Sequence, residues 1–262
     1  MFYNLTIWLE VFNINWFEIL SFIPIGILSG IVSATVGLAS LVSYPALQVV
    51  LPAKLANITN TTALICTGIG SGLGSLKELK GHWWQVTKIF AITFVGAIIG
   101  SLMLLQFSNQ AFAKIAPIFI LISGFLILIP QSHLTNAGSP GSKWAKYLAI
   151  FAMFIVGIYS GYFAAASGIL MLALLNYTTN ESFPVYNAIR NVALLSANIV
   201  AIIIFALKSH IDWQLAIPMG IGLLIGSYIG PIIVRHVPEK ILKIVVAIAA
   251  ILMSGYLFWK AY

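Results

Sequence analysis

Long apolar runs recur along the whole chain and are separated by short polar stretches. Most runs hold about 18 residues or more, which lets an α-helix cross a bilayer and is about twice the length of a membrane-spanning β-strand. Six runs predict ordinary membrane-spanning helices, near residues 58–76, 87–106, 111–130, 186–207, 215–234 and 240–260. The pattern therefore predicts an all-α, polytopic integral membrane protein.

Two further apolar segments, near residues 20–50 and 147–175, are rich in glycine and serine. Each holds about 30 residues. This length is too great for one straight crossing of a membrane core about 30 Å thick and rather short for two crossings. Lipid offers no hydrogen-bond partners, so a broken helix at membrane depth needs protein or a water-filled cavity around it. We therefore expect both segments to be interrupted inside the protein.

These two segments open two internal repeats. The stretch "GILSGIVSATVGLASL" at 26–41 aligns with "GIYSGYFAAASGILML" at 157–172, and the same offset of 131 pairs Asn60 with Asn191. The hydrophilic stretch "QSHLTNAGSPGSK" at 131–143 falls between the halves. We expect one transmembrane domain, residues 1–262, with repeat 1 at about 20–130, a linker at 131–145 and repeat 2 at about 146–260.

The distribution of basic residues indicates whether the glycine-rich segments cross the membrane or re-enter it, because Lys and Arg accumulate in short cytoplasmic loops. If both segments cross fully, the two membrane faces carry seven and six basic residues; if both dip in and return, they carry nine and four. The second count favours re-entrant segments. Three full spans per repeat then make the two repeats inverted, as in many secondary transporters, and both termini are expected outside the cytoplasm.

Composition agrees with the membrane class, with 61% hydrophobic residues, 7% charged residues and a mean hydropathy of +1.04. The net charge of +7 comes from scattered Lys and Arg residues, so the dense basic patch of a nucleic-acid-binding protein is not expected. The single cysteine, Cys66, excludes an intramolecular disulfide and a CxxC site. The first 20 residues contain no Lys or Arg, so no removable signal peptide is expected.

The glycine-rich turns are the first candidate binding site, because free N–H groups at the start of a half-helix attract anions. Nearby hydroxyl groups add hydrogen-bond donors without fixed charge. Helix packing through small residues is the alternative for these segments, and it is the interpretation we favour for the GxxxG pairs at 96–100 and 222–226. The candidates are Gly30, Ser33, Thr35, Gly37, Ser40, Gly161, Ser167 and Gly168, with Ser43 and Ser160 as further hydroxyls.

A second matched element is "ANITN" at 56–60 and "NAIRN" at 187–191. Asn60 and Asn191 are equivalent in the repeats, and equivalent polar residues near a pseudo-twofold axis are candidates for a shared site. Hydrogen bonding between helices is the alternative. Arg190 stands at the position of Thr59 and is either a side chain that snorkels to the interface or the cation that recruits an anionic substrate.

Acidic residues are absent from the centres of the apolar runs. All six lie near segment ends or in loops, namely Glu10, Glu18, Glu78, Glu181, Asp212 and Glu239. Without a central carboxylate, cation transport is disfavoured. The four histidines form no ligand pairs in the sequence, and no serine or cysteine has a nearby base, so we expect no metal, no cofactor and no enzymatic activity.

Several of these motifs resemble the sulfite exporter TauE/SafE family. They are the repeated "GxxSGxxxxxxG" opening, Pro45, the Ala-x-x-Thr-Asn step at 56–60 and "DWQ" at 212–214, and the resemblance runs from about residue 20 to 260. It implies a bacterial-type inner-membrane carrier of sulfur-containing anions such as sulfite, sulfoacetate or other organosulfonates. It also implies a site formed by the turns at 30–40 and 161–168 with Thr59, Asn60, Arg190 and Asn191. The chain departs from the family at "VGLAS" (36–40) and "AASGI" (165–169), where one glycine replaces a run of two or three.

The leading hypothesis is a secondary transporter that moves a small anion across the lipid bilayer by alternating access, with export as the direction that the resemblance implies. One alternative is an uptake carrier or channel for thiosulfate or another small anion. Another is a membrane scaffold that binds a partner without transporting. The sequence leaves the anion, the coupling ion and the oligomeric state open, a homo-oligomer being one alternative.

Overall fold

The structure is a computed structural model that describes residues 16–116, 118, 143–165, 167–236, 244 and 248. Every regular element in these ranges is helical, which confirms the predicted all-α class. Four stretches are long and apolar enough to cross a membrane: Ile19–Val36, Trp83–Gln106, Phe183–Lys208 and Trp213–His236. The helices are α2 (Trp16–Val36), α3 (Ser40–Val50), α4 (Ala53–Ala63), α5 (Ile65–Gly74), α6 (Leu76–Leu79), α7 (Trp83–Gln106), α9 (Lys143–Tyr162), α10 (Ser167–Thr178), α11 (Phe183–Ala193), α12 (Leu195–Lys208) and α13 (Trp213–His236).

The predicted spans at 87–106 and 215–234 correspond to α7 and α13. The span near 111–130 is helical up to residue 116, and most of its remainder lies outside the described residues, as does most of the span near 240–260. Residues 131–142 of the predicted linker also lie outside them. Helix α9 begins at Lys143, so the last residues assigned to that linker already belong to the helix.

The span predicted near 58–76 is divided into two helices, because α4 ends at Ala63 and α5 begins at Ile65, with a kink at Leu64 between them. The Leu64 carbonyl accepts hydrogen bonds from Thr67 Oγ1 (2.7 Å) and from Asn198 Nδ2 (3.1 Å). Side-chain donors that enter the helical hydrogen-bond ladder are a known cause of kinks. A matching kink at Leu194 separates α11 from α12, within the span predicted at 186–207.

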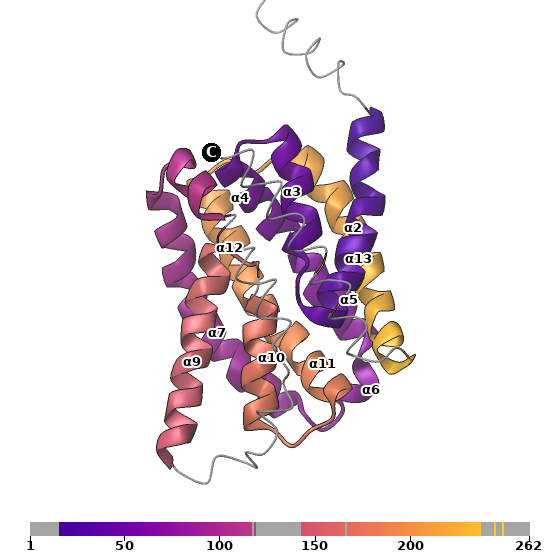
Figure 1. The fold of residues 1–262 in the computed structure, drawn as a ribbon, viewed down its shortest axis with the longest axis vertical. Coiled ribbons are helices and arrows are strands. Elements are labelled where there is room, and N and C mark those ends of the chain that lie inside the picture. The colour runs from indigo at the N-terminus through magenta and orange to yellow at the C-terminus, as the bar shows by residue number, and fades with distance from the viewer. Residues whose placement is uncertain are drawn as a thin grey trace, which may run out of the picture.

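Both glycine-rich segments are broken, and the chain reverses direction at each break. Figure 1 shows that α2 and α9 begin at opposite ends of the molecule, and that α3 and α10 return toward the ends where α2 and α9 began. The two breaks meet, since a Cβ built on Gly37 would lie 2.9 Å from the Cα atom of Gly168. Phe163, just after α9, packs edge-to-face on Tyr44 of α3 with ring centroids 5.5 Å apart.

Two helix pairs flank the breaks, α2 with α13 and α7 with α9. The helices of each pair run parallel and approach so closely that an added Cβ would overlap the backbone of the neighbouring helix. Each pair joins a helix of one predicted repeat to a helix of the other. The glycines at the contacts are Gly26, Gly30, Gly222 and Gly226 in the first pair and Gly96, Gly100, Gly157 and Gly161 in the second.

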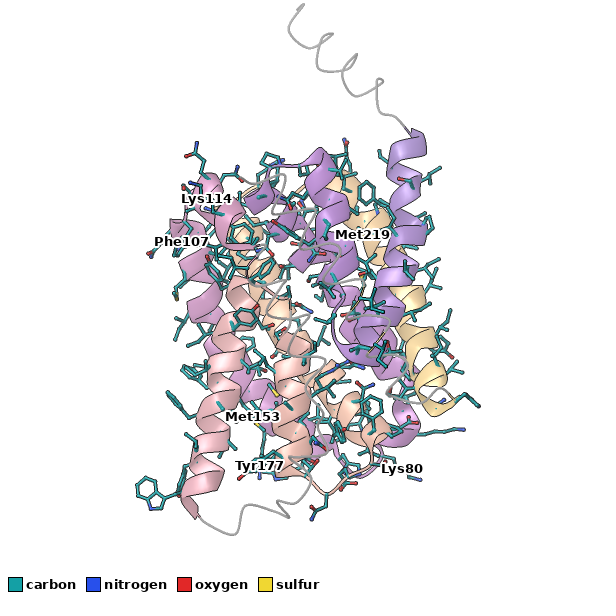
Figure 2. All side chains as sticks on the ribbon, in the orientation of Figure 1. Lys80, Phe107, Lys114, Met153, Tyr177 and Met219 are labelled. Atoms are coloured by element: carbon teal, nitrogen blue, oxygen red, sulfur yellow. The ribbon has the colours of Figure 1, made fainter. Side chains whose placement is uncertain are left out.

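Charged side chains concentrate at the two ends of the molecule, where Figure 2 shows Lys80 at one end and Lys114 at the other. Between the ends, the outward faces of α7, α9 and α13 expose large apolar side chains such as Ile99, Phe151 and Ile225. An exposed apolar band with charged ends fits a lipid environment.

Candidate functional site

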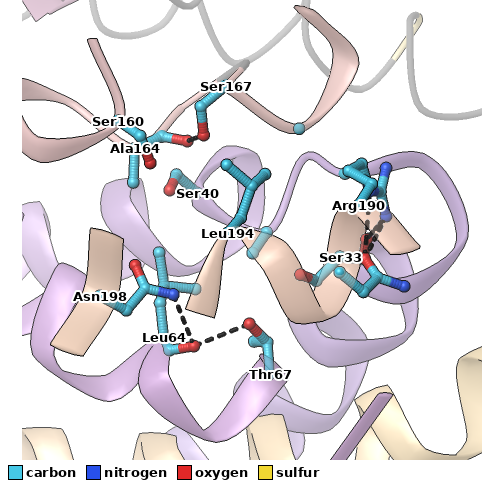
Figure 3. A pocket seen from close by; sticks show the side chains of 14 residues that line it. Ser33, Ser40, Leu64, Thr67, Ser160, Ala164, Ser167, Arg190, Leu194 and Asn198 are labelled. Atoms are coloured by element: carbon cyan, nitrogen blue, oxygen red, sulfur yellow. Dashed lines mark hydrogen bonds between the residues drawn. The ribbon is translucent and has the colours of Figure 1, made fainter. Parts of the chain in front are cut away.

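A polar cavity of about 50 Å³ lies where the two broken segments meet (Figure 3). Its wall is built from α2, α3, α5, α9, α10, α11 and α12, so every broken or kinked helix contributes to it. The lining residues are Ser33, Gly37, Ala39, Ser40, Leu64, Thr67, Ser160, Ala164, Ser167, Gly168, Arg190, Asn191, Leu194 and Asn198.

Arg190 of α11 is the charged residue of this wall, and only 1% of its surface is exposed. Its Nε atom donates to Asn191 Oδ1 (3.1 Å), and its Nη2 atom donates to the Ser33 carbonyl (2.8 Å) and also to Asn191 Oδ1. The Nη1 atom is buried and has no partner among the described residues. Of the two interpretations that the sequence left open, snorkelling to the interface is therefore wrong, because the side chain is enclosed by protein.

No described carboxylate balances the charge of Arg190. Glu78 pairs with Arg235, Glu181 Oε1 lies 3.9 Å from His82 Nδ1, and Asp212 Oδ1 accepts the backbone N–H of Leu215. None of these three acids lines the cavity. A buried charge is costly unless it is paired, so the cavity has the electrostatics of an anion site.

Neutral donors also face the cavity. The Ser40 hydroxyl accepts a hydrogen bond from Asn60 Nδ2 (3.1 Å), which leaves its own proton free to be donated. The hydroxyls of Ser33 and Ser160 have no hydrogen-bond partner among the residues that the structure describes. The backbone N–H groups of Ala39 and Ser40, at the start of α3, also lack a described partner. A helix start and a buried guanidinium thus converge on one small space.

Asparagine side chains hold the ends of the two broken helices. The last carbonyls of a helix lack intrahelical donors, and here Ala34 O accepts from Asn187 Nδ2 (2.7 Å) and Asn191 Nδ2 (3.2 Å). Tyr162 O, at the end of α9, accepts from Asn57 Nδ2 (3.2 Å). Each helix end is therefore fixed by a helix from the other half of the chain.

Gly37 has φ of +88°, a left-handed conformation that suits glycine. Gly37 is the single glycine of "VGLAS", the stretch in which the chain departs from the family. The chain therefore still has a glycine at the turn itself. A Cβ built there would overlap the Arg190 guanidinium and the backbone of Gly168. The absence of a side chain at this position lets Arg190 lie against the break.

Seven of the twelve sequence candidates line the cavity: Ser33, Gly37, Ser40, Ser167, Gly168, Arg190 and Asn191. Asn60 lies behind the wall and contacts it through Ser40. The sequence expected Asn60 and Asn191 to be equivalent, but Asn191 contacts Arg190 whereas Asn60 contacts a hydroxyl. Both asparagines also bond to neighbouring helices, as the alternative interpretation required.

Four candidates do not reach the cavity lining. Gly30 packs on α13 and Gly161 packs on α7, so the helix-packing alternative describes these two glycines. The Thr35 hydroxyl donates to the Ile31 carbonyl of its own helix (2.8 Å), and the Thr59 hydroxyl accepts the backbone N–H of Asp212 (3.3 Å). Ser43, named as a further hydroxyl, donates to the Ala39 carbonyl (3.0 Å).

Sequence reasoning missed Thr67 and Asn198, which both line the cavity. The offset of 131 that pairs Asn60 with Asn191 also pairs Thr67 with Asn198. Each lies seven residues after its asparagine, which places it on the same helix face two turns later. A search for polar residues at that spacing in both halves would have found them.

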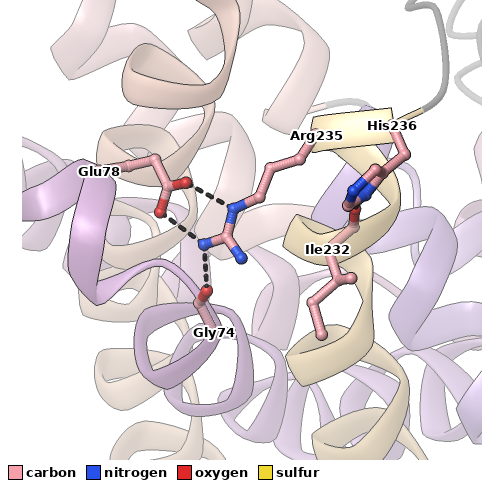
Figure 4. A network of polar contacts seen from close by, with 5 residues as sticks. All are labelled: Gly74, Glu78, Ile232, Arg235 and His236. Carbon is pink, nitrogen blue, oxygen red and sulfur yellow. Dashed lines mark hydrogen bonds and ion pairs between the residues drawn. The ribbon is translucent and has the colours of Figure 1, made fainter.

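A second polar network lies at one end of the molecule (Figure 4). Arg235 Nε donates to Glu78 Oε1 (2.7 Å), and Arg235 Nη2 donates to Glu78 Oε2 (2.9 Å) and to the Gly74 carbonyl (2.9 Å). The hydrogen bond from Arg235 lowers the pKa of Glu78. Unlike Arg190, this arginine has a bidentate carboxylate partner.

Comparison with known proteins identifies the family. The family model described as Sulfite exporter TauE/SafE matches residues 22–257. The chain belongs to the sulfite exporter TauE/SafE family. Proteins named "Probable membrane transporter protein YfcA" from Escherichia coli K12 and Escherichia coli O157:H7 are each 24% identical to it over 242 residues, which cover 91% of this chain and 88% of theirs. No solved structure matches it.

This TauE/SafE family chain is an integral membrane transporter and not an enzyme. The family and the four candidate spans together indicate that it is embedded in a lipid bilayer. Within the described ranges, no group of three or more His, Cys, Asp or Glu residues could hold a metal ion. The polar cavity where the broken segments meet is the candidate substrate site of this transporter.

Proposed function

We propose that this transporter exports a small inorganic sulfur oxyanion, such as sulfite or thiosulfate, through the cavity beside Arg190. The observation that carries the proposal is the buried Nη1 atom of Arg190, which has no described partner in a wall without a described carboxylate. An oxyanion would accept hydrogen bonds from this guanidinium, from the hydroxyls of Ser33, Ser40 and Ser160, and from the first N–H groups of α3. Charge-assisted hydrogen bonds of this kind are the strong ones.

The size of the cavity supports a compact anion. About 50 Å³ gives room for roughly four water-sized groups at about 10–15 Å³ each. Sulfite and thiosulfate are of this size, whereas sulfoacetate adds a carboxylate arm that would require the cavity to enlarge. Among the sulfur anions carried by the family, the geometry therefore favours inorganic oxyanions over organosulfonates.

Alternating access between two inverted halves is the mechanism we propose. Its support is the start of α2 and α9 at opposite ends of the molecule and the meeting of both breaks at Gly37 and Gly168. Asn57 and Asn187 also bond across the two halves to the ends of the broken helices. A site at the interface of two repeats, formed by broken helices, is the common arrangement of secondary transporters.

We further propose an inner-membrane location with the Lys80 end of the molecule in the cytoplasm and both termini outside it. Figure 1 places α6, the start of α7 and the end of α13 at the Lys80 end, and these elements carry Lys77, Lys88 and Arg235. It places the start of α4 and the end of α12 at the Lys114 end, and these carry Lys54 and Lys208. The cytoplasmic excess of Lys and Arg supports this orientation. Arg190 is one of the nine basic residues that the re-entrant arrangement places on the cytoplasmic face, but it is buried beside the cavity and belongs to neither face.

Thermal unfolding of the purified protein tests the proposal. Sodium salts of sulfite, thiosulfate, sulfate, sulfoacetate and chloride are compared at constant ionic strength, together with the zwitterion taurine. A ligand that binds only the folded state stabilises it by about 2.7 kcal/mol at 100 times its Kd, so sulfite or thiosulfate should raise the unfolding temperature more than sulfoacetate or taurine. Folded protein that responds to none of these anions would contradict the proposal.

Two variants form the matched control for this experiment. Arg190→Gln removes the cation of the cavity and should abolish the shift, while Arg235→Gln removes a cation at the end of the molecule and should retain it. Anion flux into proteoliposomes then separates the remaining hypotheses. A channel would give conductance far above carrier turnover, and a scaffold would give no flux.

A further inference from the structure

The buried charge of Arg190 meets neutral acceptors among the described residues. Its hydrogen bonds go to the Ser33 carbonyl and Asn191 Oδ1, and its Nη1 atom has no described partner. The three acids with described side chains are engaged elsewhere with His82, Leu215 and Arg235. A bound anion would supply the missing counter-charge, and an empty cavity would leave the cation uncompensated.

Alternating access requires the site to pass through a state closed to both sides of the membrane. With an anion in place, Arg190 is paired in that closed state. Without an anion, the protein must enclose an unpaired guanidinium away from water, which is strongly disfavoured. The loaded transporter can therefore change sides much more readily than the empty one.

We propose that this protein is an anion exchanger, in which one compact anion leaves the cavity on one side of the membrane and a second must enter before the transporter returns. The inference rests on the proposed function and deepens it by naming the second substrate. The counter-anion belongs to the same chemical class, a small inorganic anion, because the same charge and the same volume of about 50 Å³ select it. Export of the sulfur oxyanion is then driven by the gradient of the anion that enters.

Co-transport with a cation is the competing arrangement, and the cavity wall argues against it. A coupling cation requires acceptor groups, most often a carboxylate at membrane depth. The wall has no described carboxylate, and the Leu64 carbonyl already accepts from Thr67 and Asn198. A cation would also add positive charge next to Arg190.

Exchange can be measured with the full chain in proteoliposomes, using ³⁵S-labelled thiosulfate as the probe. The vesicles contain either unlabelled thiosulfate or only gluconate, which is too large for the cavity. Initial uptake into thiosulfate-loaded vesicles should be at least about tenfold faster, which corresponds to 1.4 kcal/mol between the two return steps. A potassium diffusion potential that is positive inside should not raise uptake into gluconate vesicles to the loaded rate.

Equal initial rates in the two kinds of vesicle would overturn the exchange mechanism while leaving the proposed function intact. Uptake into gluconate vesicles that reaches the loaded rate under a sodium or proton gradient would overturn it in favour of cation coupling. Absence of uptake in every vesicle, together with no thermal shift by any anion, would instead overturn the proposed function, and the exchange mechanism with it.

Three variants identify the cause of exchange. Arg190→Gln removes the unpaired charge, so the ratio of loaded to gluconate uptake should fall toward one even though total uptake falls. Arg190→Lys keeps the charge and should keep a high ratio. Ser160→Ala removes a neutral donor and should weaken thiosulfate affinity without changing the ratio. A high ratio that persists in Arg190→Gln would show that the charge is not the cause.

Discussion

Arg190 and Arg235 perform the same structural task in two regions of the molecule, but they have different partners. Each donates from Nη2 to a carbonyl near the C-terminal end of a helix in the first half of the chain, Ser33 in α2 and Gly74 in α5. Arg235 also meets the Glu78 carboxylate and is partly exposed, whereas Arg190 is buried and meets only neutral acceptors among the described residues.

On the proposed function, the difference separates a stabilising charge from a charge that binds the substrate. A paired arginine near solvent keeps its counter-ion whether or not a ligand is present, so the charge of Arg235 does not require a ligand. The energy of the buried arginine depends on what occupies the cavity beside it. The contrast between these two arginines leads to four tests.

The largest effect is expected from adding a methyl group beside Arg190, in Gly37→Ala. Gly37 and Gly81 share a left-handed backbone, with φ of 88° and 89°, but a Cβ on Gly81 would meet nothing within 4 Å. Gly81→Ala should cost about 1–2 kcal/mol of unfolding free energy from backbone strain alone. Gly37→Ala should cost roughly 2–5 kcal/mol, because overpacking against Arg190 and Gly168 is added. Thermal unfolding of both variants measures the difference, and equal losses would contradict the close packing at the breaks.

The second effect concerns anion affinity. Truncating one partner of a buried charged hydrogen bond typically costs about 2–5 kcal/mol, so Arg190→Gln should weaken thiosulfate binding by about a hundredfold or more. The free energy of unfolding without anion should change little, because the three hydrogen bonds of Arg190 are lost while an unpaired charge is removed. Calorimetric titration with thiosulfate measures the affinity, and thermal unfolding without anion measures the stability, with Arg235→Gln as the control in each. Wild-type affinity in Arg190→Gln would remove this arginine from the site.

A smaller effect is expected at the paired arginine. The Glu78 and Arg235 side chains are 13% and 30% exposed, so solvent screens their attraction. Glu78→Gln and Arg235→Gln should each lower the unfolding free energy by at most about 1 kcal/mol, with the thiosulfate-induced shift unchanged. A double-mutant cycle gives the coupling energy of the pair. A change in the thiosulfate shift would link this end of the molecule to the cavity.

The smallest effect is the pH dependence of the same pair. The hydrogen bond from Arg235 lowers the pKa of Glu78 below its ordinary value of 4.5, so the unfolded state binds a proton more readily than the folded state. The stabilisation is therefore complete above the unfolded pKa and is lost as the pH falls below 4.5 through the folded pKa. The difference in unfolding temperature between wild type and Glu78→Gln should vanish on acidification. A difference in unfolding temperature that grows at low pH would contradict the lowered pKa of Glu78.

The sequence predicted the elements better than it predicted the cavity. Apolar runs and glycine content located both broken segments, because lipid imposes a hydrogen-bonding requirement that residue types reveal. The kink at Leu64 could not be predicted locally, since it involves a donor on Asn198 that is 134 residues away. Local sequence holds no signal of which distant side chain will reach a given carbonyl.

The glycines illustrate the same limit within one motif. Gly30 and Gly37 both belong to the opening "GxxSGxxxxxxG", yet Gly30 packs against α13 and Gly37 lines the cavity. The residue type indicates only that a neighbouring segment of backbone can approach closely at both positions. The burial of Arg190 could not be predicted for the same reason. It depends on contact with the end of α2, and the sequence near "NAIRN" does not indicate that contact.

The parallel contact between α2 and α13 has a consequence for synthesis of the protein. The glycines of α2 find their partners Gly222 and Gly226 about 200 residues later in the chain. At about 5–20 residues per second, α2 waits roughly 10–40 s after its own translation before its packing partner exists. During that interval its small-residue face is open to lipid or to other newly made helices, so a chain truncated before Trp213 would leave that face permanently unmatched.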